Sequence, residues 1–151
     1  MGIFSKNKPF FTEPEHKRIV DAIRAAEKET SGEVRIYVES RNPFVEPLDR
    51  AREVFFSLKM ENTKDRNAVL LYIAMKDHEL ALFGDEGIHQ KVGVEYWNKA
   101  VKDMIAEFSG EHIVNGIEQC ILQIGQTLKE TFPYVSATDK NELPDDLVFG
   151  K

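Results

Sequence analysis

The run AVLLYIAM at residues 68–75 is the longest apolar stretch of the chain, and it decides the fold. It is apolar on both faces, which is typical of a central strand covered by helices on both sides. Lys76 and Asp77 follow as a tight turn, and residues 79–83 then resemble a returning strand. The stretch therefore predicts an antiparallel hairpin whose first strand lies inside the sheet.

The strand that precedes this hairpin is the run EVRIYVE at residues 33–39. Its apolar and polar side chains alternate, so the run predicts a strand with one apolar face. An amphipathic segment at about residues 48–59 predicts the helix that connects the two strands. A strand, a crossover helix and a second strand normally run parallel, so we expect residues 33–39 and 68–75 to pair in parallel.

Helices are predicted on either side of these strands. Thr12 and Glu15 form a capping box at the start of an apolar stripe that extends to about Thr30. After the hairpin, two amphipathic segments separated by Gly110 continue to Pro133. The expected fold class is α/β: a mixed sheet of about four strands flanked by helices on both faces, a Rossmann-like αβα sandwich.

Composition limits the function classes. A length of 151 residues fits one domain, which we place at residues 9–134, followed by a polar, acidic tail at 135–151 whose Leu147-Val148-Phe149 can dock on the body. The net charge of −6 argues against a nucleic-acid partner. One cysteine cannot build an internal disulfide framework. Neither a signal peptide nor a membrane span is recognised, so we expect a cytoplasmic protein.

The predicted topology brings three loops to one end of the sheet. The starts of the two parallel strands lie at the same end, and the hairpin returns the third strand there, at the GDEG segment of residues 84–87. Polar and acidic side chains are concentrated in these loops. They are Ser31, Glu33, Asp65, Arg66, Asn67, Asp85, Glu86 and His89.

Two interpretations of this cluster remain open from the residues alone. Carboxylates, an amide oxygen and a hydroxyl are the ligands that hard cations prefer. However, Asp is also favoured in turns and at helix starts, so from the residues alone Asp65 and Asp85 are better explained as caps. Arg66 has the chemistry to meet a phosphate or to pair with a neighbouring acid. His89 is the one histidine that belongs to the cluster.

At these residues the chain resembles the TPM domain family. The resemblance is carried by TSGEVR at residues 30–35, RNAVL at 66–70 and GDEGIH at 84–89, followed by Val92-Gly93, Trp97 and Phe132-Pro133. Together, and in this order, the motifs are similar to a soluble bacterial branch and cover nearly the whole chain from Pro9. The resemblance implies a four-stranded sheet flanked by helices and a divalent-cation site, usually calcium. Many relatives carry a signal peptide and a membrane anchor, which are not recognised here.

Two functions follow from the resemblance and the cluster. The first is a domain that binds a divalent cation, calcium or alternatively magnesium, through Glu33, Asp65, Asp85 and Glu86, with Ser31, Arg66, Asn67 and His89 as further ligand contacts, coupled to a protein partner. The second is a metal-dependent acid phosphatase, because a plant member in the thylakoid lumen is described as one. We favour binding, because the sequence offers no activated nucleophile and no clear general acid. We expect a monomer and no membrane-spanning segment.

Overall fold

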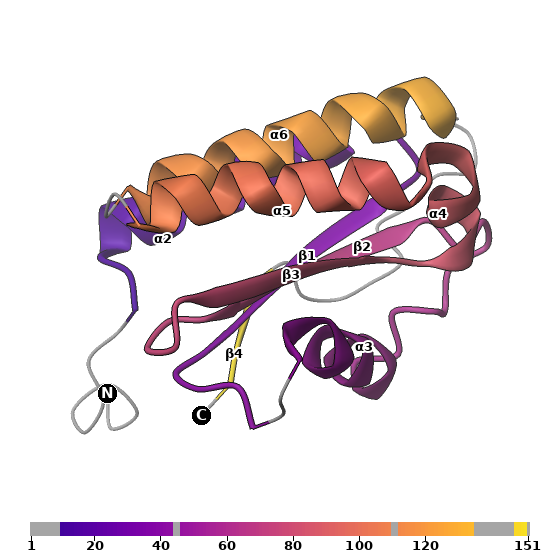
Figure 1. Ribbon diagram of the computed structural model, residues 1–151. Coiled ribbons are helices and arrows are strands. Elements are labelled where there is room, and N and C mark those ends of the chain that lie inside the picture. The colour runs from indigo at the N-terminus through magenta and orange to yellow at the C-terminus, as the bar shows by residue number, and fades with distance from the viewer. Residues whose placement is uncertain (1–9, 44–45, 110–111, 135–146, 151) are drawn as a thin grey trace.

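The computed structural model describes residues 10–43, 46–109, 112–134 and 147–150, and Figure 1 shows their arrangement. Four strands form one sheet in the order β3-β2-β1-β4. The strands are β1 (Glu33–Glu39), β2 (Ala68–Ala74), β3 (Glu79–Gly84) and β4 (Leu147–Phe149). The helices are α2 (Glu13–Glu27), α3 (Pro47–Ser57), α4 (Glu86–Val92), α5 (Val94–Ser109) and α6 (Ile113–Thr131).

The strand pairing confirms the predicted topology. β1 and β2 are parallel, with Glu33 opposite Ala68 and Glu39 opposite Ala74. β2 and β3 form the antiparallel hairpin, with Ala74 opposite Glu79. All seven residues of β2 are buried, as expected for a central strand with both faces covered.

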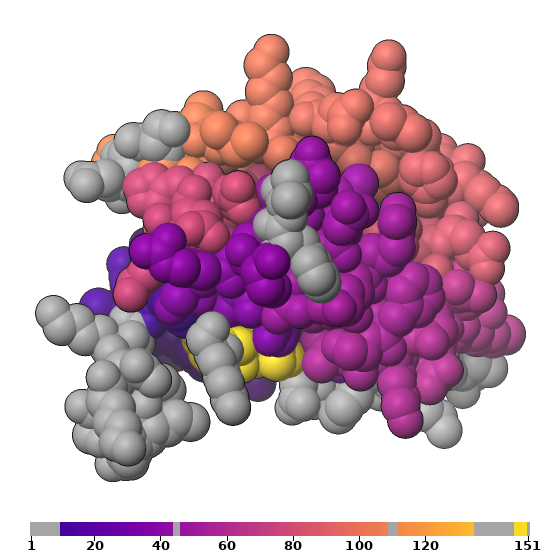
Figure 2. Space-filling view, turned by 60° about the horizontal axis from the view of Figure 1, so that its bottom comes forward, coloured from indigo at the N-terminus to yellow at the C-terminus, as the bar shows by residue number. Residues whose placement is uncertain are grey.

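Residues from the end of the chain complete the sheet. β4 pairs in parallel with β1, with Ile36 opposite Leu147 and Val38 opposite Phe149. Figure 2 shows the yellow atoms of β4 at the surface beside indigo and purple atoms from the first part of the chain. The Phe149 ring lies 6.1 Å from the Phe10 ring, centroid to centroid. Residues 147–149 of the predicted tail therefore belong to the sheet, while 135–146 and 151 lie outside the described residues.

Helices cover both faces of the sheet, as predicted. Helices α2, α5 and α6 pack on one face and α3 packs on the other (Figure 1). The larger core lies beneath the three helices and contains the inward side chains of β1, including Ile36, together with Ile23 and Ile121 from the helices. The start of α2 has the predicted capping box, since Thr12 accepts from the Glu15 amide and Glu15 accepts from the Thr12 amide.

The polar face of β1 is buried rather than exposed. Glu39 is 4% exposed and accepts two hydrogen bonds from Arg50 of α3, at 2.7 and 2.8 Å. The buried Tyr72 hydroxyl donates to the same carboxylate over 2.5 Å. Hydrogen bonding to Glu39 raises the pKa of Arg50 above its ordinary value. This charged network fixes α3 on the sheet.

The GDEG segment of residues 84–87 is only in part the loop that the sequence predicts. Asp85 ends the connection from β3 and caps α4, which begins at Glu86, in agreement with the interpretation of Asp85 as a cap. The Asp85 carboxylate accepts from the Glu86 amide over 2.8 Å. The two glycines of the GDEG motif suggested a loop, yet Gly87 lies in the first turn of α4, where a side chain would collide with neighbouring backbone.

Candidate functional site

The three predicted segments do converge at one end of the sheet, and Arg66 lies at their centre. Its guanidinium binds the Asp85 carboxylate in a bidentate pair, Nε to Oδ2 at 2.6 Å and Nη2 to Oδ1 at 2.8 Å. Its third nitrogen, Nη1, lies 2.7 Å from Glu86 Oε1. All three guanidinium nitrogens are therefore engaged by acids from the end of β3 and the start of α4.

The backbone of Arg66 also contributes to this contact between the start of β2 and the start of α4. We call the residues of this contact, Arg66, Asn67, Asp85 and Glu86, the polar junction. Its carbonyl accepts from the Gly87 amide over 2.8 Å and from the Ile88 amide over 3.3 Å, which satisfies two donors of the first turn of α4. Arg66 has a φ of +52°, the left-handed region that non-glycine residues adopt at some cost. The hydrogen bond to Asp85 raises the pKa of Arg66. Arg66 therefore connects the start of β2 to the start of α4.

Ser31 and Asn67 join the first two segments. The buried Asn67 side chain donates from Nδ2 to Ser31 Oγ over 3.2 Å. The Asn67 carbonyl oxygen Oδ1 is buried without a hydrogen-bond partner among the described residues. A buried polar atom of this kind is uncommon and indicates a place where a cation or a water molecule can bind.

The other predicted ligands do not gather around one point. Glu33 is buried at the first position of β1, Asp65 is exposed, and Asp85 has both carboxylate oxygens occupied by Arg66. Across residues 10–43, 46–109, 112–134 and 147–150, no group of three or more His, Cys, Asp or Glu side chains is placed to hold a metal ion. In this arrangement two of the predicted acids, Asp85 and Glu86, bind the Arg66 guanidinium.

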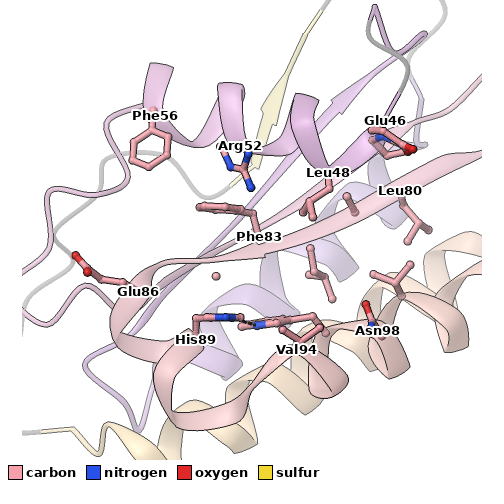
Figure 3. A pocket seen from close by; sticks show the side chains of 16 residues that line it. Glu46, Leu48, Arg52, Phe56, Leu80, Phe83, Glu86, His89, Val94 and Asn98 are labelled. Carbon is pink, nitrogen blue, oxygen red and sulfur yellow. Dashed lines mark hydrogen bonds between the residues drawn. The ribbon is translucent and has the colours of Figure 1, made fainter.

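A groove beside the cluster was not predicted from the sequence. It has a volume of about 660 Å³ and runs along β3, between α3 on one side and α4 and α5 on the other (Figure 3). Its walls are mainly apolar. The larger apolar side chains that line it are Leu48, Phe56, Leu80, Leu82, Phe83, Val94, Trp97 and Val101.

His89 and Glu86 belong to both the cluster and the groove. The Trp97 indole donates from Nε1 to His89 Nδ1 over 3.0 Å, which fixes the imidazole at the wall of the groove. Trp97 is buried, and its ring also lines the groove. Val94 and Val101 lie seven residues apart on α5, a helical spacing that is also typical of core residues, so this signal does not single out a groove wall.

The observed class is an α/β sandwich domain with a polar junction and an apolar groove at the open edge of its sheet. A model of the TPM domain matches residues 5–127, and the chain belongs to this family. A search of curated proteins gave no match. None of the helices within the described ranges is long and apolar enough to span a membrane.

Solved structures support the same fold. The BA42 protein from the psychrophilic bacterium Bizionia argentinensis, solved by NMR, is 38% identical over 97% of this chain and 99% of that chain, with a TM-score of 0.86. The N-terminal domain of the cg2496 protein from Corynebacterium glutamicum is 9% identical over 94% and 82% of the two chains, with a TM-score of 0.62. The N-terminal domain of a protein from P. gingivalis is 14% identical over 83% and 81%, with a TM-score of 0.60. The last two similarities concern the fold alone.

Proposed function

We propose that this TPM domain is a binding domain, and that its ligand surface is the groove along β3. One observation carries the proposal: Leu48, Phe56 and Val94 stand around the groove with 46%, 43% and 59% of their surface exposed. Water contact with large apolar side chains is unfavourable, and a contiguous apolar hollow on a domain surface usually marks an interaction site. The volume of about 660 Å³ lies within the usual range of ligand pockets.

Binding accounts for the polar junction better than phosphatase chemistry does. A phosphatase of this kind needs a cationic clamp for the phosphate and a metal or nucleophile beside it. Arg66 is the only candidate clamp that the sequence suggested, and its nitrogens are occupied by Asp85 and Glu86. The junction therefore serves to place α4, and with it His89, beside the groove.

The groove predicts binding of an apolar probe. We expect 1-anilinonaphthalene-8-sulfonate to gain fluorescence on the native protein, because its ring system can leave water for the apolar walls. Val94→Asp should weaken this binding about tenfold, because a carboxylate at the mouth repels the sulfonate and makes the wall polar. Dye titration of the two proteins, with circular dichroism to confirm folding, measures the effect.

Leu122→Asp is the matched control. Leu122 lies on α6, is 45% exposed, and does not line the groove, so its replacement should leave dye binding unchanged. If the native protein does not bind the dye, or if both variants lose it equally, the groove is not the ligand surface.

Our second proposal is that a divalent cation, calcium or magnesium, binds at the polar junction. It is supported by the unpartnered Oδ1 of Asn67 and by the exposed carboxylate of Asp65, the residue two positions earlier. A ligand that binds only the folded state adds about 2.7 kcal/mol at a hundredfold excess over Kd. For a domain of this size we expect the melting temperature to rise by about 5–10 °C.

Calorimetric melting with and without millimolar calcium measures this shift. Asp65→Asn should reduce the shift, because it removes a charge and keeps an oxygen, while Glu118→Gln on α6 should leave it unchanged. If calcium changes neither the melting temperature nor the amide signals of residues 65–67, the acids act only as caps and as partners of Arg66.

A further inference from the structure

The floor of the groove is the edge of β3, where Leu80, Ala81 and Leu82 keep 4%, 5% and 3% of their surface exposed. β3 lies at one side of the sheet, next to β2 alone. The Asp85 amide donates to the Ala68 carbonyl over 2.9 Å, so the odd-numbered residues of β3 direct their backbone groups toward β2. Leu80, Leu82 and Gly84 therefore direct their N–H and C=O groups outward. No hydrogen bond from another described residue satisfies these groups.

The sequence of this edge does not block strand addition. Edge strands are commonly blocked by proline, by charged side chains, by a bulge or by a covering helix or loop. Residues 80–84 read LALFG, without charge or proline, and they pair with β2 in unbroken register. An edge that is open and uncharged can accept another strand through main-chain hydrogen bonds.

The shape of the groove favours a single strand over a second copy of the chain. Leu48 and Phe56 on α3 form one wall, and Val94 on α5 forms the other, so the edge lies in a hollow (Figure 3). A second copy would bring its own α3 and α5 against these walls before its β3 could reach the edge. A lone extended segment has no such walls and can enter.

The ends of the groove specify charge. Glu46 and Glu86 lie at opposite ends of the groove in Figure 3. Glu46 makes no ion pair with the residues that the structure describes, whereas Glu86, whose side chain is 59% exposed, already pairs with Arg66 over 2.7 Å. Arg52 is the cation that lines the groove. Its guanidinium lies over the Phe83 ring and 3.8 Å from the Asp49 carboxylate, so its charge already has interaction partners. The Glu46 end is thus complementary to a basic side chain.

We propose that the groove binds an extended segment of a partner protein as an added strand on β3, with about five apolar residues and a lysine or arginine at the end that meets Glu46. The proposal rests on the proposed function of the groove. Because both walls are mainly apolar, both faces of the added strand must be mainly apolar. Residues 80–84 span about 13 Å at the rise of a strand, which sets the length of the apolar centre.

The test uses the peptide KKVTVIVKK, a copy with the same side chains but N-methyl groups on the residues of its apolar centre, and a charge-reversed EEVTVIVEE. In an NMR titration of the full chain we expect the first peptide to shift Leu80, Leu82 and Gly84 amides and to slow their hydrogen exchange. The N-methylated copy should bind at least tenfold more weakly, because it cannot complete the ladder. The charge-reversed peptide should also bind at least tenfold more weakly.

Variants of the protein test the contribution of charge to peptide binding. Glu46→Gln should weaken the binding of KKVTVIVKK about two- to fivefold, as expected for the loss of one exposed ion pair. Glu95→Gln on α5, outside the groove, should have no effect.

Three results would overturn strand addition. The first is equal binding of the N-methylated copy. The second is no peptide binding in a protein that still binds the apolar dye, which would leave the groove as a ligand surface of another kind. The third is slowed exchange at Leu82 that depends on protein concentration without peptide, which would identify a second copy as the occupant. Loss of dye binding as well would instead remove the proposed function itself.

Discussion

Replacing Glu39 with glutamine should lower the free energy of unfolding by about 3 kcal/mol. This is the largest effect that we expect from a single substitution of a polar side chain. Glu39 is buried and its carboxylate is bound by Arg50 at both oxygens. Glutamine keeps the size but turns one acceptor into a donor that faces the guanidinium. Arg50, 17% exposed, then keeps its charge without its main partner. The Tyr72 hydroxyl also loses an ionic acceptor.

Urea unfolding measures the change, and thermal melting should show a fall of about 6–12 °C for a domain of this length. Glu53→Gln is the matched control, because Glu53 binds the same Arg50 but its side chain is 50% exposed. An exposed pair contributes at most about 1 kcal/mol, so this variant should stay close to the native protein. Equal losses in the two variants would contradict the view that burial of Glu39 makes the network important.

This network also affects the groove. Arg50 and Arg52 lie on the same helix, α3, which carries Leu48 and Phe56 into the groove wall. Binding through Glu39 is what holds the polar side of α3 to β1, while Val54 and Phe55 hold the apolar side. Loosening α3 should therefore weaken dye binding in the Glu39 variant even where the protein remains folded.

The sheet could be predicted because its signals are local. Alternation in residues 33–39, the apolar run that begins at Ala68 and a short turn define three strands, and the crossover rule then fixes their relative direction. The capping box at Thr12 is equally local, since its two partners are three residues apart. Each of these predictions depends on neighbours in sequence or on a general rule of chain topology.

The candidate site could be predicted only in part, because it depends on contacts between side chains that are far apart in the sequence. Topology brought Arg66 and Asp85 to one end of the sheet, and it left open whether Arg66 meets a phosphate or an acid. The pairing is decided by a left-handed backbone at Arg66 and by the cap of α4. The groove was missed because its walls come from α3 and α5, which no local pattern places opposite each other.

Gly87→Ala should destabilise the protein by about 1–3 kcal/mol, although alanine is the better helix former by about 1 kcal/mol. A Cβ at Gly87 would lie 2.1 Å from the Asp65 carbonyl oxygen and 2.6 Å from the Arg66 carbonyl oxygen. The Arg66 carbonyl also accepts the amides of Gly87 and Ile88, so it cannot move away without loss of these bonds. Steric conflict should therefore exceed the gain in helix propensity.

Chemical unfolding with amide NMR tests this result and its location. The signals of Arg66 and Asp85 should shift in Gly87→Ala, because α4 and the start of β2 must separate. Gln90→Ala, an exposed position in the same helix, should leave both signals and the stability nearly unchanged, which separates helix propensity from packing. A Gly87→Ala protein more stable than the native one would mean that the junction is loose enough to admit a methyl group, and that Arg66 does not hold α4 at the groove.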